Sequence, residues 1–150
     1  RRQLIGVYSP NLTDTLAEVL LRLGSERALV VHGSDGLDEI TTTGETKVSE
    51  LRDGTVQTYP IQPEDFGLKK ASLQDLKGAD EETNAKILTD VLKGAEGPKR
   101  DAVLLNAAAG ITAGGSASDI FEGISIARDS IDSGRAMKKL EGLRKMSNAG

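Results

Sequence analysis

Short apolar runs alternate along the chain with apolar residues spaced as on one face of a helix. The runs at residues 4–8 and 28–32 predict two strands. Between them, Asn11 can cap a helix that Gly24 ends. The apolar positions on one face of that helix are Leu16, Val19, Leu20 and Leu23. A strand, a helix and a second strand in this order form a βαβ unit, whose strands we expect to be parallel with a right-handed crossover.

A β-hairpin is predicted in the middle of the chain. Residues 47–52 and 55–61 flank Asp53-Gly54, the dipeptide that favours a two-residue type I′ turn. Pro60 and Pro63 are expected to end the hairpin, because proline cannot donate a backbone hydrogen bond to a strand ladder. An antiparallel ribbon should therefore follow the parallel unit.

The second half of the chain is predicted to be helical. Residues 80–92 carry an apolar stripe, and Pro98 opens a helix whose stretch 101–113 is apolar on nearly all sides, as in a buried helix. Asn106 lies within that stretch, and we expect a structural role for it, because a buried amide needs hydrogen-bond partners. Two further amphipathic helices are expected to cover the sheet. Their apolar positions are Ile120, Phe121, Ile124, Ala127 and Ile131 in one, and Ala136, Met137, Leu140 and Leu143 in the other.

These elements predict an α/β fold over residues 1–150, with a partial open sheet, a βαβ unit, a hairpin and covering helices. A chain of 150 residues is long enough to bury a sizeable core. The chain begins with Arg1 rather than Met, directly before an apolar run. We therefore expect that a preceding part of the protein is missing from it.

Composition narrows the range of partners. The chain has 19 Lys and Arg against 23 Asp and Glu, a net charge of -4, and no basic block marks a nucleic-acid-binding surface. No apolar run approaches membrane-spanning length, and no signal peptide is visible at this start. Cys is absent, which rules out a disulfide framework. We expect a cytoplasmic protein without nucleic-acid or membrane partners.

Three carboxylates follow the second predicted strand within five positions: Asp35, Asp38 and Glu39. Neighbouring carboxylates repel one another, and no Lys or Arg lies between residues 30 and 45 to neutralise them. In a parallel sheet this segment lies at the carboxyl edge, where open α/β sheets bind ligands. The pattern therefore indicates a hard cation with phosphate bound to it. Mg2+ is favoured over Zn2+, because Mg2+ takes one or two carboxylates together with water and phosphate, whereas the chain has no Cys and one His.

Plainer interpretations of the charged residues stay open at this point. The three acids could form a solvated surface loop, as many Asp-Glu pairs do. His32, at the end of the second strand, is interpreted as a hydrogen-bonded structural residue rather than a ligand. A basic cluster near the C-terminus is interpreted as a solvated helix face, with a site for phosphate or an acidic partner as the minority interpretation. Its members are Arg135, Lys138, Lys139, Arg144 and Lys145.

Several segments of the chain resemble anthranilate phosphoribosyltransferase, and their order and spacing match over nearly its whole length. The segments are RRQLIGVYSP, LAEVLLRLGSERALVVHGSDGLDEIT, ELRDG, PEDFGL, GPKRDAVLLNAAA and IDSG. The resemblance implies that residues 1–150 are the C-terminal portion of the α/β domain of a nucleoside phosphorylase/phosphoribosyltransferase-type fold.

The resemblance also implies a reaction. It is the transfer of phosphoribosyl from phosphoribosyl pyrophosphate to the amino group of anthranilate, with release of pyrophosphate, in tryptophan biosynthesis. The family's Asp-Glu pair matches Asp38 and Glu39, which the resemblance makes Mg2+ ligands. Asp35 does not fall on that pair and is expected to be a loop residue beside it. No residue of this chain is assigned a catalytic role.

Other parts of the family pattern have no counterpart in this sequence. They are the glycine-rich phosphate loop, the Ser or Thr that helps bind the metal, the lysine after the loop, the arginine that contacts anthranilate, and the helical domain through which the family forms homodimers. The substrate-binding residues are therefore expected outside the chain, which alone should be inactive. The alternative is a catalytically silent module with a structural or interaction role. A pyrimidine nucleoside phosphorylase-like function is less favoured, because the PEDFGL and GLDEI segments match the anthranilate enzyme.

Overall fold

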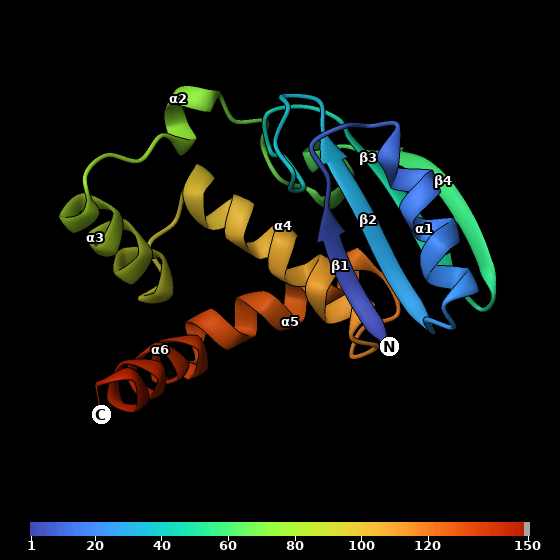
Figure 1. Cartoon of the computed structure of the whole chain (residues 1–150). Coiled ribbons are helices and arrows are strands. Elements are labelled where there is room, and N and C mark those ends of the chain that lie inside the picture. Colours follow the sequence, from blue (N-terminus) through green and yellow to red (C-terminus); the bar gives the residue numbers. More distant parts are fainter. Residues whose placement is uncertain (149–150) are drawn as a thin grey trace.

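The computed structural model describes residues 1–148, which form a four-stranded sheet with helices packed on both of its faces (Figure 1). The strands are β1 (Arg2–Gly6), β2 (Arg27–Gly33), β3 (Thr46–Arg52) and β4 (Thr55–Ile61). The helices are α1 (Leu12–Arg22), α2 (Leu73–Leu76), α3 (Glu81–Leu92), α4 (Pro98–Ala113), α5 (Ile120–Asp132) and α6 (Arg135–Ser147), with a 3-10 turn η1 (Pro63–Phe66). The predicted α/β class is confirmed.

The sheet has the strand order β1-β2-β3-β4. β1 and β2 are parallel and joined through α1, as predicted for the βαβ unit, whereas β3 and β4 are antiparallel to their neighbours. Asp53 and Gly54 join β3 to β4 with φ angles of 50° and 77°, as a type I′ turn requires. Pro63 lies just beyond the end of β4, as predicted, whereas Pro60 lies inside the strand. The position tolerates proline because β4 is an edge strand.

β2 runs through the centre of the core. Its side chains alternate between the two faces of the sheet, and every residue from Ala28 to Gly33 is buried. Ala28 and Val30 pack in a cluster with α1, whereas Leu29 and Val31 pack in a second cluster with α4 and α5. Burial on both faces explains why the strand is a continuous apolar run instead of an alternating one.

The buried face of α1 differs from the predicted one. Of the predicted positions, Leu20 is buried, whereas Val19 and Leu23 are 43% and 74% exposed, and the helix also buries Thr13 and Ala17. A threonine can occupy this face because the Thr13 hydroxyl donates a hydrogen bond to the Pro10 carbonyl at 3.1 Å. The helix therefore presents Leu20 together with two smaller residues to the sheet, and Val19 and Leu23 lie at the margin.

The sequence predicted that the last two helices both cover the sheet, but only α5 does so. Ile120 and Ile124 of α5 join the core beside α4, although Phe121 is 64% exposed. α6 has no buried residue and lies beside α5 and α3, away from the strands (Figure 1). The reason is that α4 and the start of α5 already cover that face. None of the helices within residues 1–148 has the length and apolar character needed to cross a membrane.

Candidate functional site

The segment between β2 and β3, residues 34–45, carries the three predicted acids and is called the acidic loop below. It is folded back on the end of β2 by backbone hydrogen bonds from Gly33 N to the Leu37 carbonyl (2.9 Å) and from Ser34 N to the Glu45 carbonyl (2.8 Å). Gly36 has a φ of +90°, which favours glycine. The loop therefore starts and ends at the carboxyl end of a buried strand, as predicted.

Asp35 braces the acidic loop from within. Its carboxylate accepts hydrogen bonds from the hydroxyls of Thr41 and Thr43, the second at 2.8 Å, and from the backbone N–H of Leu37 at 3.2 Å. Partial burial alone would raise the pKa of Asp35, but the two hydroxyl donors outweigh it and hold the pKa below the usual value of 3.8. Asp35 is thus a loop residue whose oxygens are used within the protein.

Asp38 and Glu39 project from the same loop into solvent. Both side chains are exposed, and within residues 1–148 neither takes part in an ion pair or a side-chain hydrogen bond. Their backbone, in contrast, is fixed. The carbonyl of Asp38 packs directly on Gly6 at the end of β1, and the next residue, Ile40, is 2% exposed in the core. The two carboxylates are thus exposed, while the backbone that carries them is held in place by packing.

The Asp38–Glu39 pair suits Mg2+ but is not a complete metal cage. No group of three or more His, Cys, Asp or Glu side chains in residues 1–148 is arranged to hold a metal ion. Mg2+ is commonly bound through one or two carboxylates, with water and substrate phosphates at its other positions. Free hard oxygen donors in a loop without a basic side chain match that requirement. Such a pair can hold the cation only together with an anionic ligand.

His32 and Asn106 both form hydrogen bonds that hold the protein together. His32 is 8% exposed, and its Nδ1 lies 2.7 Å from the carbonyl oxygen of Val7, the residue after β1. Asn106 of α4 binds both backbone groups of Ile40 in the acidic loop. Both residues thus form the hydrogen bonds expected from the sequence, and Asn106 adds a direct link between α4 and the loop that carries the acids.

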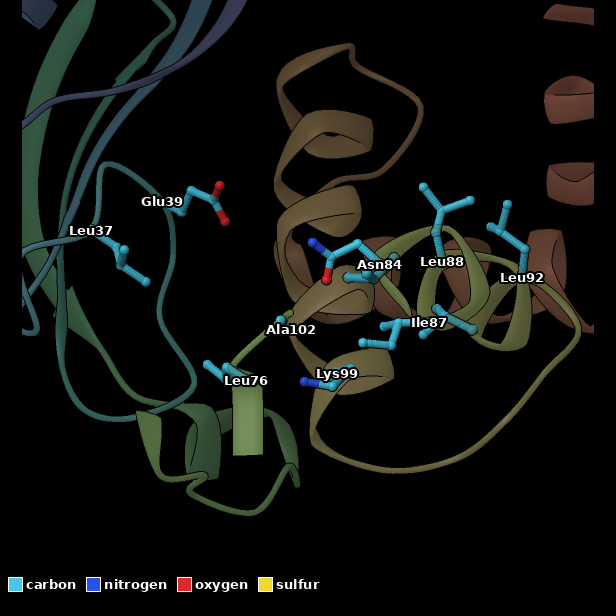
Figure 2. Close-up of a pocket in the computed structure, with 12 residues that line it drawn as sticks. Leu37, Glu39, Leu76, Asn84, Ile87, Leu88, Leu92, Lys99 and Ala102 are labelled. Atoms are coloured by element: carbon cyan, nitrogen blue, oxygen red, sulfur yellow. The ribbon is translucent and has the colours of Figure 1, made fainter. Parts of the chain in front are cut away.

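An apolar groove of about 580 Å³ lies beside the acidic loop. No pattern in the sequence predicted it. Figure 2 shows Leu37 and Glu39 on the loop side of this groove and Ile87, Leu88 and Leu92 on the α3 side. The apolar stripe of α3 lines the groove: Val91 is buried, but Leu88 is 49% exposed. A stripe of this kind has the same sequence pattern whether a neighbour covers it or not. The pattern therefore gave no signal of the groove.

Lys99 is the basic residue at the edge of this groove. Its amino group donates hydrogen bonds to the carbonyl oxygens of Asp75 (2.8 Å) and Lys77 (2.7 Å), at the end of α2. The charge of Lys99 is therefore directed at the connection between α2 and α3. It forms no ion pair with the acidic loop in the part of the chain that the structure describes.

The α/β sheet, with an acidic pair in the loop after β2, is accompanied by a match in sequence to a protein family. Residues 1–137 match the model of the glycosyl transferase family, a/b domain. The chain therefore belongs to the glycosyl transferase family.

Relatives of the chain carry the name anthranilate phosphoribosyltransferase. The enzyme of Thermoanaerobacter sp. (strain X514) is 56% identical over 138 residues, which are 92% of this chain and 41% of that protein. The enzyme of Rhizobium meliloti is 53% identical over 149 residues, 99% of this chain and 44% of that protein. The resemblance stated from the sequence is confirmed, and the chain spans about two fifths of the length of these relatives.

Solved structures of the same enzyme superpose on the chain. The crystal structure from Thermus thermophilus has a TM-score of 0.81 and 44% identity, and the match covers 91% of this chain and 40% of that one. The structure from Saccharomyces cerevisiae in complex with PRPP and Mg has a TM-score of 0.80 and 32% identity, and covers 93% of this chain and 41% of that one. The fold is thus that of an anthranilate phosphoribosyltransferase over the matched region.

Proposed function

We propose that this chain acts as part of an anthranilate phosphoribosyltransferase of tryptophan biosynthesis. The reaction moves phosphoribosyl from phosphoribosyl pyrophosphate to the amino group of anthranilate and releases pyrophosphate. The observation that carries the proposal is the exposed Asp38–Glu39 pair on an anchored loop, in a chain whose relatives carry that enzyme's name. A related structure that contains PRPP and Mg supports the choice of ligand.

In this proposal, Asp38 and Glu39 bind the Mg2+ that accompanies the pyrophosphate. Two carboxylates facing a pyrophosphate without a cation would repel it, so the acids can contribute to substrate binding only through a metal. When bound, Mg2+ neutralises charge that develops on the leaving pyrophosphate. The carboxylates hold the ion in place and do not attack the ribose, so their role is electrostatic and no covalent intermediate is required.

The shape of the acidic loop supports this role. A metal site needs ligands whose positions are set before the metal arrives, because ordering a flexible loop would cost binding free energy. The backbone around the pair is fixed by Gly6, by the buried Ile40 and by the Asp35 hydrogen bonds. The side chains of Asp38 and Glu39 remain accessible to an ion and its phosphate.

The test is a chimera in which this chain replaces the matched segment of the Thermoanaerobacter enzyme. We expect Mg2+-dependent consumption of anthranilate in the presence of phosphoribosyl pyrophosphate. The double variant D38N/E39Q should lower the rate at limiting Mg2+ by more than the roughly 10- to 100-fold seen when residues that support metal ligands are lost. The double variant E81Q/E82Q is the matched control, because it removes an adjacent pair of exposed acids at the start of α3.

Two results would contradict the proposal. A chimera that folds but consumes no anthranilate would favour the silent-module alternative. A chimera whose D38N/E39Q variant keeps the Mg2+ dependence of the unsubstituted chimera would show that the acids are not the metal ligands. The second result would leave the enzymatic function standing and remove only the assignment of the pair.

A further inference from the structure

The amide of Asn106 is paired with the backbone of one residue of the acidic loop. The backbone N–H of Ile40 donates to Asn106 Oδ1 at 2.9 Å, and the Ile40 carbonyl accepts from Asn106 Nδ2 at 2.8 Å. Nδ2 also donates to the carbonyl of Ala102, one turn earlier in α4, at 3.0 Å. These three bonds fix the orientation of the side-chain amide and of the Ile40 peptide groups together.

This pairing connects the acidic loop to a closely packed part of the core. Asn106 lies in the middle of α4, where Leu105, Ala108 and Ala109 are each 0% exposed. Ile40 directly follows Glu39, and its own side chain belongs to the same core cluster as Leu105. The backbone that carries Glu39 is therefore held on its C-terminal side by both the buried Ile40 side chain and the half-buried Asn106 amide.

No second side chain duplicates this contact. Within residues 1–148, Asn106 is the one side chain that hydrogen-bonds the backbone of residues 38–40. Asp35 binds Leu37 N on one side, and Thr46 Oγ1 accepts from Thr41 N on the other. Asp35 therefore holds the backbone before the Asp38–Glu39 pair, and Asn106 holds the backbone of Ile40 directly after it.

We propose that Asn106 is a positioning residue for the Asp38–Glu39 metal site, an inference that rests on the proposed function of that pair. Asn106 does not touch the ion. It holds the Ile40 peptide so that the two carboxylates keep a fixed separation from the end of β1, where Asp38 packs on Gly6. Residues that orient metal ligands from behind usually contribute about 10- to 100-fold to metal affinity.

A merely structural Asn106 would behave differently. Removing the amide leaves the N–H and carbonyl of Ile40 without their partner, so any substitution should lower the stability of the protein. A loss of stability alone does not decide between the two roles. A loss of metal affinity in a protein that is still folded does, because the ion contacts the loop and not the helix.

The experiment is a titration of the chimera with Mn2+ in the presence of inorganic pyrophosphate, followed by paramagnetic broadening of the backbone amide signals of Asp38 and Glu39. In N106A, the Mn2+ concentration for half-broadening should rise about 10- to 100-fold. The Ile40 amide should also lose its protection from hydrogen exchange. The control is T112V, because the Thr112 hydroxyl is buried on the same helix and donates to the Asp119 carbonyl at 2.8 Å, far along α4 from the acidic loop.

A second variant covers the case in which N106A does not fold. In N106T, the hydroxyl can still bond the carbonyl one turn back in the helix, as threonine does, but cannot pair with both groups of Ile40. The inference is supported if the Asn106 variants weaken Mn2+ binding and T112V does not. It is overturned if Mn2+ binding is unchanged in the folded Asn106 variants, or if T112V weakens Mn2+ binding to the same extent.

The D38N/E39Q variant separates this inference from the function it rests on. Unchanged broadening in that variant would remove the metal site itself, and the role of Asn106 with it. Lost broadening in D38N/E39Q combined with unchanged broadening in N106A and N106T would keep the metal site and reject the positioning role alone.

Discussion

The carbonyl oxygen of Asp38 occupies the space that a Cβ atom at position 6 would need. Gly6 is the last residue of β1, and Asp38 lies in the loop that follows β2, so the contact joins the ends of two parallel strands. The close approach requires a residue without a side chain. It places the backbone of the first proposed metal ligand directly on the sheet.

The substitution G6A should therefore be severely destabilising. Because the clash involves a backbone carbonyl, it cannot be relieved by a rotamer change, and the acidic loop must move. We expect a loss of more than about 3 kcal/mol in the free energy of unfolding, at or above the usual range for overpacking. Urea denaturation measures this loss.

The matched control for G6A is G110A. A Cβ at Gly110 meets nothing within 4 Å, and the residue lies in the helix α4. Alanine is more favourable than glycine in a helix by about 0.5–1 kcal/mol, so G110A should be neutral or stabilising. Equal denaturation midpoints for G6A and G110A would show that the close approach between β1 and the acidic loop is not present in solution.

Acid should weaken the acidic loop through Asp35. Its pKa is lowered in the folded protein, so its carboxylate stabilises the fold fully above the unfolded value of 3.8, and this contribution is lost as the pH falls through the lower folded pKa. D35N should reduce the melting temperature at neutral pH, and its difference from the unsubstituted protein should shrink below pH 3.8. Melting curves over a pH series test the sign. T41V/T43V should flatten the same profile, because it removes the two hydroxyl donors, and an unaltered profile in that variant would exclude this cause.

Truncation of a leucine should lower the stability strongly in α4 but hardly at all in α6. Leu105 is 0% exposed in the main core, so L105A should cost about 2–5 kcal/mol. Leu143 is 64% exposed on α6, so L143A should stay within about 0.5 kcal/mol. Thermal and urea unfolding of the two variants would check this. A large loss in L143A would mean that α6 is covered in solution.

The hairpin turn offers a test of backbone strain. Asp53 has a φ of 50° and is the one non-glycine residue with positive φ in the described part of the chain. A β-branched residue is poorly tolerated there, so D53V should cost about 1–2 kcal/mol, whereas D53N should be neutral. The measurement is the denaturation midpoint. Equal midpoints for D53V and D53N would argue against the type I′ turn.

The elements that a local pattern determines were predicted well from the sequence. The β2 run, the Asp53-Gly54 turn and Pro98 at the start of α4 each depend on a few neighbouring residues, and each was found where expected. The faces of the helices were harder to predict. Val19, Phe121 and Leu143 have the spacing of buried residues yet are exposed, because spacing does not say which neighbour covers a helix.

The candidate site shows the same division. The position of Asp38 and Glu39 after a buried strand follows from the strand pattern. The contacts that hold their backbone do not follow from that pattern, because Gly6 and Asn106 lie 32 and 68 positions away from Asp38 in the sequence. Nothing in the local sequence links either residue to the loop. From the sequence, Asn106 could be recognised only as an amide within an apolar stretch, which needs hydrogen-bond partners if it is buried.

The two edges of the sheet are unequal. At β4, Pro60 lacks the N–H that an added strand would have to use, and an unbroken ladder cannot form along it. At β1 no proline interrupts the strand, and its outward backbone groups can pair with another strand. The sheet can therefore be widened in one direction only, past β1. Because Gly6 ends that strand, any added neighbour would bring its own end close to Asp38.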